Sequence, residues 1–183
     1  MKKLIVTITL ALLMGVLMIG CTSTKSPQEP PKSPQEPPKL TITIGEKQLD
    51  YTIERNQWND TEYDREEDTF KTILKKGSES EISYIEIGKT ATISFTNNPP
   101  SKFTISDILI DENGNQRYTD KEIINFPIEL KGGKGSFEIK KHWASALSSY
   151  YVVGKTDIRG FRMTANWGEN ECEYAFIIRT DSF

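Results

Sequence analysis

The N-terminal segment most strongly limits what this chain can become. Lys2 and Lys3 precede an uncharged, mainly apolar stretch from Leu4 to Gly20, and Cys21 follows it directly. A positively charged start, an apolar core and small residues at the end are the features of a secretory signal peptide. The rest of the chain is therefore expected to fold outside the cytoplasm.

The end of this segment, Leu17-Met18-Ile19-Gly20-Cys21, resembles the lipobox of bacterial lipoproteins. The resemblance implies a signal peptide over residues 1–20, cleavage before Cys21, and a diacylglyceryl group on the Cys21 thiol. Two acyl chains hold a protein stably at a membrane, whereas one chain does not. The alternative is an uncleaved transmembrane anchor, because Leu4–Gly20 is about as long as the shortest membrane span. Both readings place the protein at the cell membrane, facing the extracytoplasmic side.

A proline-rich tether over residues 21–39 comes next. The heptapeptide Ser26–Lys32 is repeated without change as Ser33–Lys39. Proline lacks an amide proton and favours the extended polyproline II conformation. We interpret this segment as a disordered spacer between membrane and domain. A ligand for a proline-recognition domain is the alternative.

Residues 40–183 are long enough for one domain with its own hydrophobic core. Of the chain's 23 basic and 26 acidic residues, five basic and two acidic ones precede residue 40, which leaves the domain a net charge of −6. This charge argues against nucleic acid as a partner, and against binding to anionic lipid by charge. With Cys21 acylated, Cys172 has no partner for a disulfide.

Short alternating segments indicate strands throughout the domain. Leu40–Ile44 and Leu49–Ile53 predict an opening hairpin, and Phe70 to Leu74 predict a helix that Asp68 or Thr69 caps and Gly77 ends. Further strands are expected at Ile82–Ile87, Thr90–Thr96, Phe103–Asp111, Ile123–Leu130 and Ser136–Lys140, and a short helix at His142–Tyr150. Many short strands with few helices predict a mainly β fold, an antiparallel immunoglobulin-like β-sandwich with one or two short helices.

Two hairpins are defined by their turns. Asn113-Gly114 is a strong two-residue turn signal, which would place Glu112 opposite Asn115. In the last hairpin, pairing Trp167 with Cys172 puts both apolar residue sets on one face, so that Cys172 points into the core. Arg162, Thr164, Glu171 and Glu173 then take the opposite face.

Several strings resemble a domain of uncharacterised lipoproteins of Gram-positive bacteria, which is also similar to extracytoplasmic segments of membrane proteins related to BlaR-type antibiotic sensors. The strings are Trp58-Asn59, Tyr63-Asp64-Arg65-Glu66, Ile87-Gly88-Lys89-Thr90, Gly160-Phe161-Arg162 and the stretch from Trp167 to Thr180. The resemblance implies an extracytoplasmic domain in sensing or cell-wall surroundings and assigns no catalytic residue.

The sequence offers little for catalysis. His142 is the only histidine, and Cys172 belongs to a distant segment that points inward. Ser145, Ser148 and Ser149 follow His142 but lack the setting of an activated nucleophile. One histidine and one free thiol do not make a zinc site. We expect a non-enzymatic domain without a cofactor.

Calcium is an alternative at two acidic segments. Acidic residues crowd between Asp60 and Asp68, around Asp64, where hard cations would find carboxylates. Asp111 to Glu122 matches the ligand spacing of an EF-hand loop, but Gln116 stands where glycine is needed. We interpret the first segment as a solvated loop and the second as a hairpin, without metal.

Three aromatic residues in polar or irregular stretches, Trp58, Tyr63 and Trp143, form the candidate ligand surface. Exposed aromatic rings stack on sugars, so a carbohydrate or peptidoglycan module is one hypothesis. The leading hypothesis is a domain that binds or senses a cell-wall component or a protein partner, and a cell-wall hydrolase is the other class.

The lipobox generates the first test. We expect Cys21→Ser to abolish acylation and leave an unprocessed precursor, because the thiol is the acyl acceptor. Metabolic labelling with a tagged fatty acid measures this. Equal labelling of wild type and variant would contradict the lipoprotein assignment.

Overall fold

The computed structural model describes residues 34–64, 67–76, 82–149 and 152–183. They belong to one compact unit that spans Ser33–Phe183. The signal peptide, Cys21 and the first copy of the heptapeptide lie outside the described residues. Within the described part of the chain, no helix is long and apolar enough to cross a membrane.

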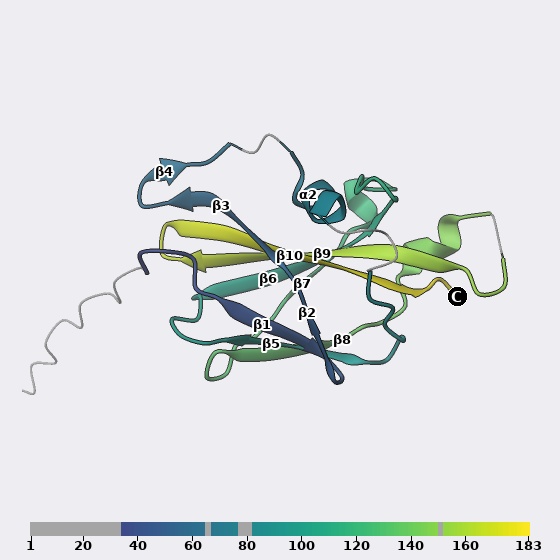
Figure 1. Cartoon of the computed structure of the whole chain (residues 1–183), viewed down its shortest axis with the longest axis horizontal. Helices are drawn as coiled ribbons and strands as arrows, with labels where there is room; N and C mark the ends of the chain where they lie inside the picture. The colour runs from purple at the N-terminus through teal and green to yellow at the C-terminus, as the bar shows by residue number, and fades with distance from the viewer. Residues whose placement is uncertain (1–33, 65–66, 77–81, 150–151) are drawn as a thin grey trace, which may run out of the picture. The chain divides into compact units, whose positions relative to one another are not determined.

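Among the described residues, ten strands form two antiparallel sheets packed face to face (Figure 1). The four-stranded sheet has the order β2-β1-β5-β8, from Lys47–Leu49, Leu40–Ile44, Thr90–Phe95 and Lys134–Glu138. The six-stranded sheet has the order β4-β3-β10-β9-β6-β7, from Thr61–Glu62, Thr52–Trp58, Asn170–Asp181, Thr156–Trp167, Lys102–Ile110 and Ile124–Pro127. The helix α2 spans Thr69–Lys76, and two 3-10 helices span Asp120–Glu122 (η2) and Trp143–Leu147 (η3). The predicted antiparallel β-sandwich with few short helices is confirmed.

The opening hairpin is confirmed, but it is shorter than expected. Ile44 pairs with Lys47 across the turn, and β2 ends at Leu49. After Asp50 the chain crosses to the other sheet, where Ile53 pairs with Tyr174. The alternating pattern continues across this change of sheet because both strands contribute one face to the same core.

The hairpin of β9 and β10 is the centre of the six-stranded sheet. Each strand has twelve residues, and Phe161 pairs with Phe176 with their rings stacked 4.8 Å apart. Trp167 pairs with Asn170 and not with Cys172, so the predicted register is wrong by two residues. The reason is the turn: Gly168 has φ +62°, which allows a two-residue connection where four residues were expected. A shift of two keeps every side chain on its face, so Trp167 and Cys172 are buried as predicted.

The outer face of this hairpin is also covered. Helix α2 lies on it (Figure 1), and Phe70 packs with Ile108, Ile158 and Ile177 in a second apolar cluster. Glu173, expected to face outward, is therefore buried. Its carboxylate accepts a hydrogen bond from the Thr69 hydroxyl at 2.7 Å and lies 3.3 Å from the Arg162 Nε.

Helix α2 begins as predicted. The Asp68 carboxylate accepts a hydrogen bond from the Phe70 backbone amide at 2.9 Å, which satisfies one of the open amides of the first turn. The predicted end at Gly77 lies outside the described residues.

The Asn113-Gly114 turn differs from its prediction by one residue. The Asp111 amide donates to the Asn115 carbonyl at 2.8 Å, and Ile110 pairs with Gln116. The loop therefore has three residues and ends with Gly114 at φ +81°, a common hairpin connection of that length. The Asp111 carboxylate favours this three-residue loop, because it accepts hydrogen bonds from the backbone amides of Asn113 and Asn115 at 2.9 and 2.8 Å.

Other strand predictions have mixed outcomes. Ile82–Ile87 is not a strand: Tyr84 forms a single bridge to Arg179 of β10, beyond Ala175, where the pairing of β3 with β10 ends. The remaining strands are confirmed within a few residues, and β7 with Pro127 is an edge strand as predicted.

The second heptapeptide is part of the folded unit and not only a spacer. The Trp58 indole Nε1 donates to the Gln35 carbonyl at 2.9 Å, and the Tyr174 hydroxyl donates to the Pro38 carbonyl at 2.5 Å. Two core aromatic side chains thus find their polar partners in Pro34–Lys39, because a buried polar group without a partner is costly. The packed structure therefore begins before the expected boundary at Leu40 and includes Pro34–Lys39.

The close approach of α2 to β9 depends on Gly160. A Cβ at this position would lie 2.5 Å from the Phe70 ring. We expect Gly160→Ala to lower the free energy of unfolding by about 1–3 kcal/mol through overpacking. Denaturant melts of Gly160→Ala, Phe70→Leu and the double variant measure the effect. The double variant should lose less than the sum of the single losses, and strict additivity would show that the two residues do not meet.

Candidate binding groove

An open groove of about 510 Å³ lies between β3, the segment after β4 and helix α2. Its lining side chains are mostly polar and come from Ile53, Glu54, Arg55, Tyr63, Asp64, Glu67 and Thr72. It is the place where the acidic segment and the aromatic candidate Tyr63 meet.

A bulge in β3 positions the Tyr63 side of the groove. Arg55 pairs with Cys172 and Gln57 with Glu171, so Asn56 is the extra residue. A bulge interrupts pairing and increases the local twist. The Asn56 carbonyl accepts the Tyr63 amide at 3.0 Å, and the Asn56 side chain donates to Glu171 at 2.7 Å. The returning segment of Tyr63 is thereby held against β3.

The groove combines one guanidinium with three carboxylates. Arg55 lies 5.8 Å from the centre of the Tyr63 ring, a cation–π distance, and 4.0 Å from the exposed Glu36 carboxylate. Glu67 forms an ion pair with Lys75 at 2.7 Å on the rim. The carboxylates of Glu54 and Asp64 add negative charge, so the groove favours polar ligands that carry hydroxyl or amino groups.

The three aromatic candidates do not form one surface. Tyr63 is 39% exposed at the groove, and Trp143 is 50% exposed on η3, in another part of the domain. Trp58 is buried, so its place in the candidate ligand surface is wrong. Its ring packs edge-on against Trp167 at 5.5 Å, and its indole N–H bonds to Gln35 in the tether.

The two calcium candidates have other partners in the structure. The hydrogen bonds from Asn113 and Asn115 engage the Asp111 carboxylate and lower its pKa. In the acidic segment, Asp68 pairs with Arg162 at 2.7 Å, and Glu66 lies outside the described residues. Over the part of the chain that is described, no group of three potential metal-ligating side chains occurs.

The histidine is buried and caps a helix. His142 Nδ1 accepts from the Ala144 amide at 3.2 Å, so the neutral ring carries its proton on Nε2, 3.3 Å from the Asp107 carbonyl oxygen. Both ring nitrogens bond to backbone, not to Ser145 or Cys172. Burial lowers the pKa of His142, and burial raises the pKa of the Cys172 thiol to about 12. Neither residue is arranged for nucleophilic catalysis.

Two ion pairs near His142 were not foreseen: both partners of Arg159–Asp107 are buried, whereas in Arg117–Asp157 only the aspartate is buried. Arg159 binds the Asp107 carboxylate through two nitrogens and donates to the Lys140 carbonyl at 2.7 Å. Arg117 pairs with Asp157 at 2.7 Å. The signal was present in the sequence, since Asp107 interrupts the apolar strand Phe103–Ile110 and charged residues begin the otherwise apolar β9.

Comparison with known proteins returns no match among protein-family models, curated proteins or solved structures. The groove and its surroundings therefore have to be interpreted from their own chemistry.

The buried histidine generates a pH prediction. Its pKa is lowered in the folded state, so unfolding takes up a proton below about pH 6.5, and stability falls with falling pH. The loss between pH 6.5 and 5.5 should approach at most about 1.4 kcal/mol, the limit for one proton per pH unit. Denaturant melts across this range measure it.

His142→Asn is the matched control, because asparagine keeps a helix-capping acceptor and does not titrate. Its stability should be flatter between pH 6.5 and 5.5, whatever its absolute value. The pKa values of Asp111 and Asp157 are also lowered, but protonation of these carboxylates reduces the stability only below about pH 4. An identical slope in both proteins would contradict the assignment.

Proposed function

We propose that the protein is a membrane-anchored extracytoplasmic lipoprotein whose immunoglobulin-like β-sandwich is a non-enzymatic binding or sensing domain. The anchor is the diacylglyceryl group on Cys21, and the binding site is the groove beside Tyr63.

The membrane part of the proposal rests on the sequence. A positively charged start, an apolar stretch and Gly20-Cys21 are the features of an exported lipoprotein. With Pro34–Lys39 packed on the domain, Thr22–Ser33 is the connection, and twelve extended residues reach at most about 40 Å. The domain would work close to the membrane surface.

The groove carries the binding part of the proposal. It has an exposed aromatic ring, a guanidinium and several carboxylates around an open volume of about 510 Å³. Binding sites combine apolar or aromatic walls with a few polar groups that fix orientation. The resemblance to sensor-related segments adds a signalling role as one form of this function.

A carbohydrate or peptidoglycan fragment is the ligand class that this lining favours. The Tyr63 ring offers a flat apolar face, and Glu54, Arg55 and Asp64 offer acceptors and donors for hydroxyl, amide and amino groups. Trp58 no longer contributes to this hypothesis, because it is buried. A hydrolase is the other class, and product release distinguishes the two.

The test is titration of the chain from Thr22 to Phe183 with soluble peptidoglycan fragments by calorimetry. We expect saturable binding, which Tyr63→Ala weakens about three- to tenfold through the lost aromatic contact. Incubation with the same fragments should release no new reducing ends or amines.

Tyr84→Ala is the matched control, because Tyr84 is 41% exposed and does not line the groove. It should bind like wild type. Equal affinity of Tyr63→Ala and wild type would remove the groove from the proposal, and catalytic release of products by wild type would overturn its non-enzymatic part.

A further inference from the structure

Exposed apolar side chains gather in one region of the domain. Five of the seven large exposed apolar residues of the described chain belong to η3, the segment after it and the last residue. We call this set the apolar tip; it consists of Trp143, Leu147, Val152, Val153 and Phe183. Val153 is 84% exposed. A single exposed apolar side chain is ordinary, but several gathered in one region can mark an interaction site.

The η3 part of the tip is anchored by buried residues. In η3, Ala144 and Ser145 are buried between the exposed Trp143 and Leu147. His142 caps the helix from inside, and its neighbour Asp107 is held by the buried Arg159. The exposed side chains of η3 are therefore presented by a helix that is anchored in the domain.

The charge of the tip is opposite to that of the domain. From Ile139 to Thr156 there are three lysines, Lys140, Lys141 and Lys155, and no aspartate or glutamate. The Nζ atoms of Lys141 and Lys155 each lie 5.6 Å from the centre of the Phe183 ring. In a domain of net charge −6, this is a local combination of apolar and cationic side chains.

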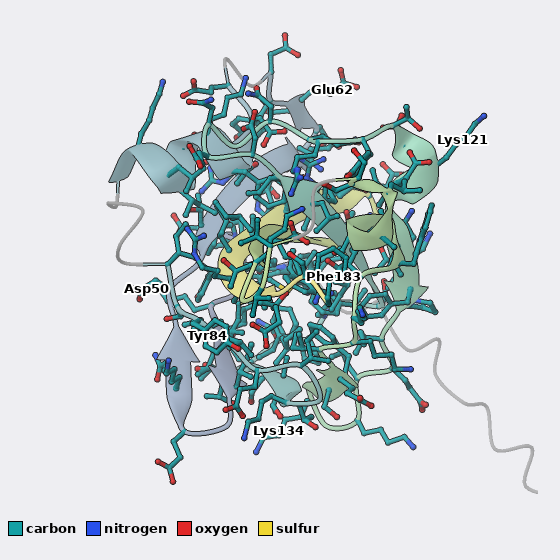
Figure 2. All side chains as sticks on the ribbon, turned by 90° about the vertical axis from the view of Figure 1, so that its right-hand side faces the viewer. Asp50, Glu62, Tyr84, Lys121, Lys134 and Phe183 are labelled. Atoms are coloured by element: carbon teal, nitrogen blue, oxygen red, sulfur yellow. The ribbon has the colours of Figure 1, made fainter. Side chains whose placement is uncertain are left out.

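The tip and the start of β1 lie at opposite ends of the domain. In Figure 1 the start of β1 lies at the left, and η3 with the end of the chain lies at the right. Figure 2 looks onto that right-hand end, where Phe183 is turned toward the viewer. The tip is thus separate from the groove beside Tyr63.

We propose that the apolar tip inserts into the interface of a lipid bilayer that carries anionic headgroups. Tryptophan places its ring at the headgroup level, aliphatic side chains enter the acyl boundary, and lysines meet lipid phosphates. Charge complementarity selects this occupant, because Lys141 and Lys155, beside the Phe183 ring, fit an anionic surface. An acidic protein is the competing occupant, and the test separates the two.

The experiment uses the chain from Thr22 to Phe183, which lacks the acyl anchor and retains the compact unit. It is mixed with phosphatidylglycerol–phosphatidylcholine vesicles or with phosphatidylcholine vesicles alone. We expect sedimentation with the anionic vesicles, less at high salt, and a blue shift of tryptophan emission. The shift reports on Trp143, because Trp58 and Trp167 are buried.

Val153→Asp should reduce anionic-vesicle binding at least tenfold, and Lys141→Glu should reduce the preference for anionic lipid. Lys102→Glu is the control, because it makes the same charge change at an exposed residue that pairs with Asn166, at the end of β9 opposite to the tip. It should sediment like wild type, and all variants should keep the melting temperature within a few degrees.

Three results would overturn the proposal: no binding to anionic vesicles, equal binding by Val153→Asp, or binding of polyglutamate in solution with the same dependence on Lys141. The last would assign the tip to an acidic protein. The outcome is independent of Cys21 acylation and of ligand binding in the groove.

Discussion

The pairing of β9 with β10 is the interaction on which the rest of the structure depends. Twelve residues of each strand pair in continuous antiparallel register, and both faces of the resulting ribbon are covered. The inner face carries Phe161, Met163 and Tyr174 into the core between the sheets. The outer face carries Ala175 and Ile177 against α2 and its neighbours. Both apolar cores thus share one wall.

Two side chains of this ribbon, Tyr174 and Arg159, form hydrogen bonds with segments outside it. Tyr174 donates from the inner core to Pro38, which fastens the end of the tether. Near the start of β9, the Arg159 side chain binds the Asp107 carboxylate and donates to the Lys140 carbonyl, just before η3. A buried hydroxyl or charge without a partner is destabilising, so these contacts hold Pro38 and the chain that leads into η3 in place.

The fold could be read from the sequence because alternation decides which face each strand residue takes. That is why Cys172 is buried as predicted although its partner is Ala165 and not Trp167. Turn geometry could not be read in the same way, since Gly168 and Asp111 select shorter or longer loops through single torsions and hydrogen bonds. Tyr63 and Trp143 could be named from the sequence as exposed candidates, but their separate surroundings could not, because the grouping of exposed side chains depends on tertiary contacts. Trp58 stands in a polar stretch, yet a carbonyl of the tether completes its burial.

Native-state hydrogen exchange tests this account most directly, because it measures the opening free energy of each paired amide. The amides that join β9 to β10 should exchange last and together, with an opening free energy equal to that of global unfolding. Amides of β2, β4 and η3 should exchange earlier through local opening. Exchange of the β9–β10 amides before those that join β1 to β5 would contradict the shared-wall account.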